Sequence, residues 1–272
     1  MGTKTKIDWC DSTWNPVTGC LHGCEYCYAR KIAERFAGWN SLENRGTVKG
    51  TTFWRQDGAC EPLFDVSDMQ AKTQKGGKVV PAPYPFGFCP TFHRYKLDEP
   101  QRWKKPRTIF VCSMADLFGD WVPDEWIEQV FEACEAAPQH RYLFLTKNPK
   151  RLKKLELEGK LPKQHWYGTS VTHADDTEFW SLNYNTFVSI EPMLESFSDE
   201  NHQAYRQMVP QWVIFGAETG NRKNKVIPKK EWITELIEYY GTFGYTKFFM
   251  KESLHELMGD DFKQEFPWEV DK

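Results

Sequence analysis

Short apolar runs recur along the chain, and most of them end in polar residues that precede a segment with helical periodicity. Each run is rich in β-branched and aromatic residues and nearly continuous in hydrophobicity, which is typical of strands buried on both faces of a parallel sheet. The predicted strands lie at 108–112, 142–145, 166–171, 186–190, 212–215 and 246–250, with a short first strand near 6–10.

Helical patterns fill the gaps between these runs. Residues 123–136 place apolar side chains on one stripe and carry Asp124 and Glu125 in the first turn, where the helix dipole favours anions. Residues 228–240 repeat the arrangement, with Pro228 near the helix start. Alternating strands and helices imply βαβ units with right-handed crossovers. Six or seven such units predict an α/β protein with a partial parallel (β/α) barrel rather than a complete eight-stranded one.

Residues 40–107 interrupt this rhythm. They carry Gly and Pro turns and no sustained periodicity, so they predict an irregular insertion between the first helix and the second strand. Long irregular segments in compact domains are usually functional lids or flexible, and the aromatic content here favours an ordered lid. We therefore expect a single domain over residues 1–272, with 40–107 as a lid or substrate segment inserted into it.

Composition is that of an ordinary soluble globular protein. The chain has 272 residues, of which 40% are hydrophobic and 27% charged, and a formal net charge of -3. No stretch approaches the roughly 20 apolar residues that a membrane-spanning helix needs, and the N-terminus lacks the apolar run of a signal peptide. We expect a cytoplasmic protein with no membrane partner. The overall charge by itself does not point to a nucleic-acid partner.

Three of the eight cysteines, Cys20, Cys24 and Cys27, follow the spacing C-x3-C-x2-C. In a reducing compartment such a cluster indicates a metal or cofactor site rather than disulfides. Three thiolates satisfy three irons of a [4Fe–4S] cubane and leave one iron open. S-adenosylmethionine (SAM) can chelate that iron, and an electron from the cluster then cleaves SAM to a 5′-deoxyadenosyl radical. Gly19 and Gly23 would let the backbone wrap closely around the inorganic core.

A zinc site is the main alternative, with Cys10, His22 or His93 as the fourth ligand of a tetrahedral centre. Zinc sites usually come as two spaced pairs, however, and the sequence has no second C-x2-C pair. We interpret His22 as a spacer within the loop. No role is assigned to Cys10, Cys60 or Cys89, and two isolated cysteines fall short of a second cluster. A zinc-binding or redox-sensing adaptor without catalysis is the corresponding functional alternative.

The cysteine spacing, with the aromatic Tyr26 directly before the third cysteine, resembles the signature of the radical SAM superfamily. A fuller set of strings resembles the phage Gp37/Gp68-like family, a branch of that superfamily, over almost the whole chain except about residues 40–90. The strings are IDWCDSTWNPVTGC, CEYCYA, RWKKPRTIFVCSMADLF, LTKNPKRL, FVSIEPML, WVIFGAETG and FFMKESL.

This resemblance implies a partial (β/α) barrel, a [4Fe–4S] cluster and SAM as cofactors, with Tyr26 lying against the SAM adenine. Reduction of the cluster implies a low-potential electron donor of the flavodoxin or ferredoxin type. Many radical SAM enzymes carry a Gly-Gly-Glu segment after the second strand, which contacts the SAM amino group. Ser113-Met114-Ala115-Asp116 stands at that place here. Ser113 and Asp116 are the expected contacts, since a carboxylate accepts hydrogen bonds from an ammonium.

In parallel barrels the functional groups gather at the C-terminal ends of the strands. That rule selects Asp116, Lys147, Ser170, Glu191 and Glu218, with Lys251 after the last strand. Each of these is alternatively a helix cap or a solvent-facing charge. Glu191 and Glu218 directly follow apolar runs, and a carboxylate there must face a ligand, a cation or water because burying it unpaired is costly. We expect one of them to hold the SAM ribose hydroxyls or amino group.

Three basic segments stand out at 94–107, 147–163 and 222–230. In the first, Tyr95 and Trp103 interleave with the charges. Cations with aromatics can hold a phosphate backbone while bases stack, although such segments are more often solvated helix faces. The hypothesis for the substrate is therefore a nucleotide or nucleic acid, with a peptide or small metabolite as the alternative.

Overall fold

The computed structural model describes residues 5–37, 48–67, 72–75, 78–81, 83–197, 209–219 and 222–269. The chain divides into two compact units. Unit 1 contains Ser12–Tyr142, and unit 2 contains Thr5–Asp11 together with Leu143–Lys272. Within the described ranges, no helix combines the length and the hydropathy that crossing a membrane requires.

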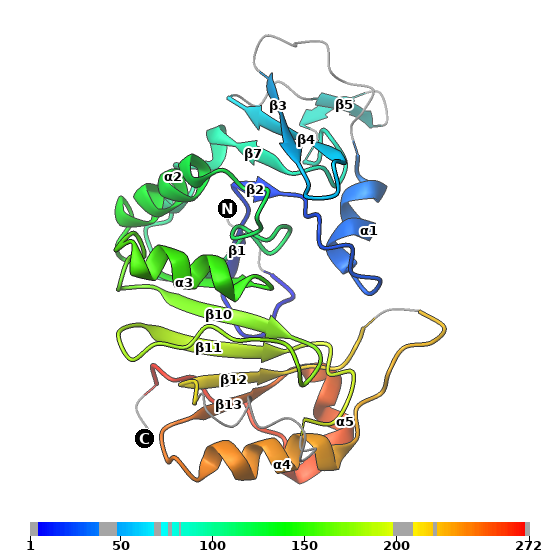
Figure 1. Cartoon of the computed structure of the whole chain (residues 1–272), viewed down its shortest axis with the longest axis vertical. Coiled ribbons are helices and arrows are strands. Elements are labelled where there is room, and N and C mark those ends of the chain that lie inside the picture. The colour runs from blue at the N-terminus through cyan, green and yellow to red at the C-terminus, as the bar shows by residue number, and fades with distance from the viewer. Residues whose placement is uncertain are drawn as a thin grey trace. The chain divides into compact units, whose positions relative to one another are not determined.

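Seven strands form one sheet, and its strands β10 to β13 can be followed in Figure 1. Its strands stand in the order β1-β8-β9-β10-β11-β12-β13, and β1 pairs with β8, and β9 through β13 with one another, in parallel. The strands are β1 (Ser12–Trp14), β8 (Thr108–Val111), β9 (Arg141–Thr146), β10 (Trp166–Val171), β11 (Asn185–Ile190), β12 (Trp212–Phe215) and β13 (Lys247–Met250). From β8 onward each strand neighbours the next one in sequence, as βαβ units require. The predicted partial parallel (β/α) barrel is confirmed.

Most of the predicted elements are confirmed. The strands from β8 to β13 match the predicted ranges to within one residue at either end. The two predicted helices are α2 (Asp124–Glu135) and α4 (Lys230–Gly241), and α3 (Pro149–Leu157) lies between β9 and β10. These strands are buried along nearly their whole length, so their hydrophobic runs are continuous and visible in the sequence.

The first strand is a correction. The sequence predicts it near residues 6–10, but β1 is Ser12–Trp14 and pairs with residues 109–111 of β8. Trp9 is instead buried in unit 2, where its ring lies 6.3 Å from that of Phe187 and 6.1 Å from that of Trp212. The apolar signal near Trp9 reflects this aromatic packing, while β1 has only three residues, of which two are polar.

The insertion at 40–107 is also corrected, because it is not irregular throughout. It supplies most of a four-stranded sheet in unit 1, in the order β2-β7-β4-β3, and a two-stranded β5-β6 sheet. Two elements of unit 1 precede the insertion, β2 (Val17–Thr18) and α1 (Tyr28–Arg35). Those within it are β3 (Val48–Trp54), β4 (Cys60–Val66), β5 (Lys72–Lys75), β6 (Lys78–Pro81), β7 (Thr91–His93), η3 (Arg94–Lys96) and η4 (Pro100–Arg102). The parts of the insertion at 40–47, 68–71, 76–77 and 82 lie outside the described residues.

These strands were missed for a physical reason. β7 has three residues, all buried, and β4 buries Leu63 and Val66 at a spacing of three, so neither shows the period of two that marks a half-buried strand. The role of this segment as a lid stays a prediction.

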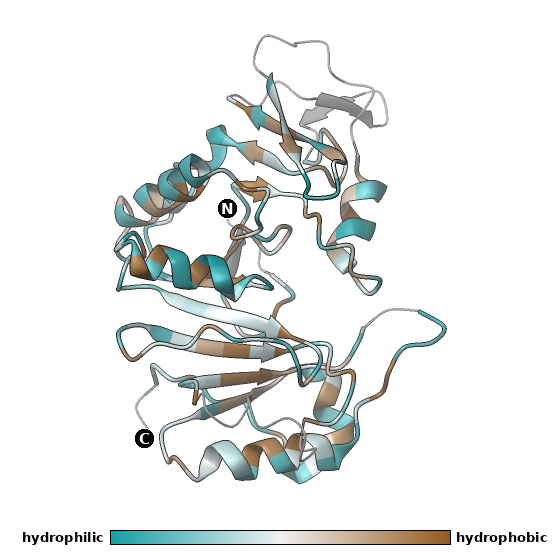
Figure 2. Ribbon diagram, in the orientation of Figure 1, coloured by the Kyte–Doolittle hydropathy of each residue, from teal (hydrophilic) through white to brown (hydrophobic). Residues whose placement is uncertain are grey.

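Unit 2 buries its core between the sheet and α4, which lies along β13 (Figure 1). Ile233, Leu236 and Tyr240 of α4 pack against side chains of β12 and β13, including Val213 and Phe248. Figure 2 shows hydrophobic residues concentrated along β11 and β12. The chain continues after β13 through η6 (Glu252–Leu254), α5 (His255–Met258) and η7 (Gly259–Asp261).

Candidate functional site

The three motif cysteines lie in unit 1 on the loop between β2 and α1. Cys27 caps α1, since its Sγ accepts a hydrogen bond from the backbone N–H of Arg30 at 3.3 Å. Gly19 and Gly23 have φ angles of 87° and 74°, in the left-handed region that side chains disfavour. A Cβ on Gly19 would lie 2.3 Å from the carbonyl oxygen of Cys89, so a glycine is required there. The backbone of this loop at Gly19 therefore packs closely against the backbone of residues 88–89.

The Cys20 thiol lies in an environment that disfavours its thiolate. Its pKa is raised to about 12, first by burial and then by the charges of Asp116, Cys24 and Cys27. A neighbouring cation would reverse this penalty, because an opposite charge favours the thiolate. The donor set therefore fits a cationic iron centre.

The loop contains no preformed site for a single metal ion. Among the described residues, no three His, Cys, Asp or Glu side chains come close enough to bind one metal ion. Cys20 and Cys27 also pack against a small apolar cluster of Ala29, Ala33, Phe88 and Met114, which would shield an inorganic core.

The turn after β8 holds the cysteine loop in place. Its first residue, Cys112, has a φ of 58°, an uncommon conformation for a side chain other than glycine. The Gly19 N–H donates to the carbonyl oxygen of Met114 at 2.9 Å. Asn15 Oδ1 accepts from the Ser113 hydroxyl at 3.1 Å and from the Met114 N–H at 2.9 Å. Backbone in such uncommon conformations is found most often at functional sites. Here it precedes residues 113–116, of which Met114 and Asp116 contact the cysteine loop.

Asp116 binds the cysteine loop directly. His22 Nε2 and Asp116 Oδ2 are 2.7 Å apart, and the other carboxylate oxygen accepts from the Phe118 N–H at 3.0 Å. The His22 ring also meets the edge of Trp121, with centroids 4.9 Å apart. His22 is exposed, as a spacer within the loop would be, and it also bonds to Asp116. Asp116 is buried and Ser113 is bonded to Asn15, so both residues are held in place by contacts within unit 1.

Tyr26 is half-buried on the cysteine loop of unit 1. Unit 2 contains the predicted residues Lys147, Ser170, Glu191, Glu218 and Lys251, and Glu191 and Lys251 follow aligned strand ends. Ile190, Phe215 and Met250 are paired across β11, β12 and β13, so the residues after them lie at one edge of the sheet. There the Lys251 ammonium forms an ion pair with Glu191. A Cβ on Gly216 would lie 3.0 Å from both side chains, so the glycine leaves room for this pair.

Glu218 is buried and forms a two-pronged ion pair with Arg222, with both N···O distances 2.7 Å. The hydrogen bond from Arg222 lowers the pKa of Glu218, so the carboxylate is charged at neutral pH. Ser170 is half-buried in register with Ser189. Burial raises the pKa of Asp176, but hydrogen bonds from Thr172 and His173, together with the charge of Lys147, lower it overall.

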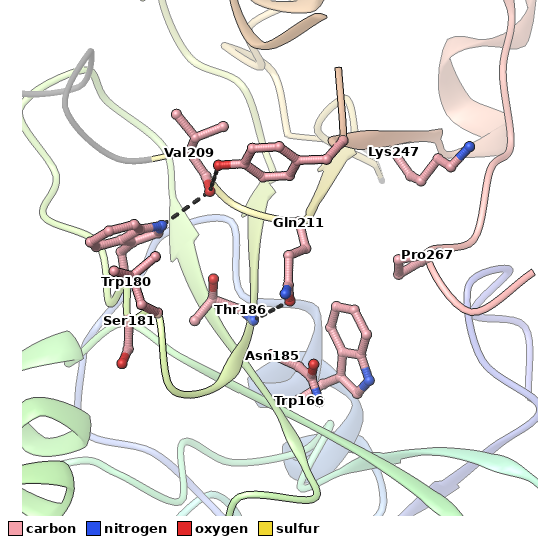
Figure 3. Close-up of a pocket in the computed structure, with 11 residues that line it drawn as sticks. Trp166, Trp180, Ser181, Asn185, Thr186, Val209, Gln211, Lys247 and Pro267 are labelled. Carbon is pink, nitrogen blue, oxygen red and sulfur yellow. Dashed lines mark hydrogen bonds between the residues drawn. The ribbon is translucent and has the colours of Figure 1, made fainter. Parts of the chain in front are cut away.

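A cavity of about 520 Å³ opens at the other edge of the unit 2 sheet (Figure 3). It lies at the N-terminal ends of β10, β11 and β13 and is lined by residues that include Trp166, Asn185 and Lys247. Trp180 Nε1 and the Tyr245 hydroxyl both donate to the carbonyl oxygen of Val209, at 3.0 Å and 3.2 Å. This edge is opposite to the strand ends from which the site residues were predicted.

Comparison with known proteins assigns the family. A sequence model of the family described as "Protein of unknown function (DUF5131)" matches residues 4–258. The chain belongs to the DUF5131 family. The matched range includes every predicted site residue of this DUF5131 protein, from Cys20 to Glu218. Curated proteins give no match.

Two solved structures are similar to this DUF5131 chain. One is a spore photoproduct lyase mutant with bound AdoMet and dinucleoside spore photoproduct, at a TM-score of 0.47 and 10% sequence identity. The other is spore photoproduct lyase complexed with dinucleoside spore photoproduct, at a TM-score of 0.43 and 10% identity. Each match covers 95% of this chain and 77% of the other. Likeness at this level assigns no activity to the DUF5131 chain.

The structure adds residues that sequence reasoning passed over. The Asn15 amide oxygen fixes the turn at 113–114. Cys112 is buried, and burial raises the pKa of its thiol to about 12. Its left-handed backbone and the His22–Asp116 contact leave no periodic signal in the sequence, because both depend on long-range pairing.

Proposed function

We propose that this chain is a radical SAM enzyme of the cytoplasm in which Cys20, Cys24 and Cys27 hold a [4Fe–4S] cluster. The observation that supports this most strongly is the cysteine loop itself. Three thiols lie within one short loop, and contacts of Gly19, Asn15 and Asp116 fix that loop on the turn after β8. The proposal extends to the phage Gp37/Gp68-like branch of the superfamily, on the sequence strings that resemble it.

Within this proposal the chain's own residues bind and orient SAM. When bound, the cluster and SAM supply a reductive C–S bond cleavage that leaves methionine and a 5′-deoxyadenosyl radical. Tyr26, between the second and third cysteines, packs beside the adenine. Ser113 and Asp116 accept hydrogen bonds from the SAM amino group, and His22 keeps the Asp116 carboxylate in position. The proposed SAM contacts from unit 2 are Lys147, Ser170, Glu191 and Glu218.

Product analysis tests this activity. Anaerobically reconstituted protein given a low-potential reductant and SAM is expected to release 5′-deoxyadenosine and methionine, slowly even without substrate. Glu191→Ala and Glu218→Ala are expected to weaken SAM binding by about tenfold, the loss of one charged hydrogen bond, while iron content stays unchanged. Leu182→Ala, an exposed side chain elsewhere in unit 2, is the matched control. Unchanged SAM affinity in both glutamate variants would contradict the placement of these contacts.

The proposed substrate is a nucleotide or nucleic acid. Within the basic segment 94–107, Arg94 is bound to Asp65 and Glu125, and Arg102 is bound to Asp98, so these cations stabilise the fold. Lys104 and Lys105 are exposed beside Trp103, which stacks against Arg107 at 4.8 Å. These two lysines are the cations that we expect to meet phosphate.

Salt dependence tests the nucleic-acid proposal. Binding of a labelled oligonucleotide is expected to weaken steeply with salt, and Lys104→Gln with Lys105→Gln should lower the slope of log K against log salt by about 2. Lys263→Gln, exposed and outside the basic segments, should leave that slope close to its native value. Binding that ignores salt, or no binding at low ionic strength, would favour a peptide or small metabolite as the substrate.

A further inference from the structure

An exposed apolar stripe runs along α1, the helix that begins one residue after Cys27. Tyr28, Ile32 and Phe36 are 49%, 37% and 46% exposed. Because they are four residues apart, they lie on one side of the helix and its C-cap. Ala29 and Ala33 seat the adjacent side of the helix against Phe88 and Met114. The Tyr28 hydroxyl donates to the Ser113 carbonyl oxygen at 2.8 Å, and the rest of the stripe is partly exposed within the described part of the fold.

Cations border the stripe. Lys31 and Arg35 are exposed and lie one turn apart next to Tyr28 and Ile32, and the Arg35 guanidinium is 5.5 Å from the Phe36 ring centroid. The helix carries three cationic side chains and one carboxylate, Glu34, whereas the whole chain has a net charge of -3. Figure 2 colours most of α1 hydrophilic, in keeping with these charges. The surface thus combines apolar contact area with local positive charge.

We infer that this α1 surface, formed by Tyr28, Lys31, Ile32, Arg35 and Phe36, docks an acidic protein that delivers single electrons to the cluster. The inference rests on the proposed function. One electron leaves the donor and enters the cluster, so the donor is oxidised and the cluster reduced by one electron, with no bond made or broken.

Three observations support this choice of partner. The stripe begins beside a cluster ligand, and electron transfer falls steeply with distance, so the donor must bind close by. Exposed apolar patches rimmed by polar groups mark protein-binding sites, and positive charge selects an acidic partner. The surface is small, and transient redox complexes bury little area, less than about 1,200 Å².

Reduction kinetics test the surface. Holoenzyme with a reconstituted cluster is mixed anaerobically with reduced flavodoxin, and bleaching of the cluster's visible absorption is followed. Ile32→Glu is expected to lower the second-order rate constant by about tenfold. Lys31→Glu with Arg35→Glu should lower it as much and should flatten its dependence on salt. Titration calorimetry with flavodoxin should show weaker binding in the same variants.

Matched controls separate the possible failures. Leu157→Glu introduces the same charge on α3, where Leu157 is 77% exposed, and should keep the native rate. Dithionite should reduce the cluster of every variant at the native rate, because a small reductant needs no docking surface. Native flavodoxin rates and affinities in all α1 variants, with dithionite reduction intact, would overturn the docking site alone. A chain that holds no reducible cluster would overturn the proposed function together with this inference.

Discussion

Cys24→Ala is expected to abolish the iron–sulfur cluster. Native protein reconstituted under anaerobic conditions should bind about four irons and four sulfides per chain, and the variant should bind fewer than about one of each, because two thiolates cannot hold three irons. Cys20→Ala and Cys27→Ala should behave alike. Colorimetric iron and sulfide analysis, with the visible absorption spectrum, measures the effect.

Two cysteines outside the motif are the controls for this experiment. Cys134 is fully buried in α2, and Cys60 is exposed on β4. Cys134→Ala and Cys60→Ala should both retain the native iron and sulfide content. Stoichiometric zinc without sulfide in the native protein would instead favour the zinc-binding alternative.

Gly19→Ala is expected to destabilise the cysteine loop far more than Gly23→Ala. Both glycines have positive φ angles, which cost an alanine about 1–2 kcal/mol. At Gly19 a Cβ would also collide with the carbonyl oxygens of Phe88 and Cys89, at 2.7 Å and 2.3 Å, whereas at Gly23 it would meet nothing within 4 Å. The collision adds a cost of about 1–3 kcal/mol, as overpacking does elsewhere.

Thermal unfolding and cluster retention measure the effects of these two glycine substitutions. Gly19→Ala should lower the unfolding midpoint more than Gly23→Ala does, and should lose most of its iron on gel filtration. Gly23→Ala should keep its iron, with a small decrease in stability. Equal effects of the two substitutions would show that the contact between the loop and residues 88–89 does not support the cluster site.

The sequence predicts the parallel strands well because strands buried on both faces consist of continuous apolar runs. β10 and β12 begin and end at the predicted residues. β1 was placed too early, since Trp9 is buried by ring packing in unit 2 while the strand itself reads STW. The strands of the insertion are short or irregularly buried, so no period of two identifies them.

Part of the candidate site is equally visible in the sequence. Local spacing identifies Cys20, Cys24 and Cys27, and Gly19 and Gly23 indicate a tightly turning loop. Contacts between distant segments are not visible in this way. The His22–Asp116 pair joins residues 94 positions apart, and the Glu191–Lys251 pair joins residues 60 apart. Such contacts follow from strand order, which the sequence does not state.

Electron paramagnetic resonance of the reduced protein tests the central claim most directly. Three cysteine ligands leave one iron open, so saturating SAM should bind that iron and change the spectrum of the reduced [4Fe–4S] cluster. Analogues that keep the adenosyl group of SAM but lack its amino and carboxylate groups should leave the spectrum unchanged. The account predicts a cluster signal that shifts with SAM. A reduced protein with no cluster signal, or with a signal that saturating SAM leaves unchanged, would contradict it.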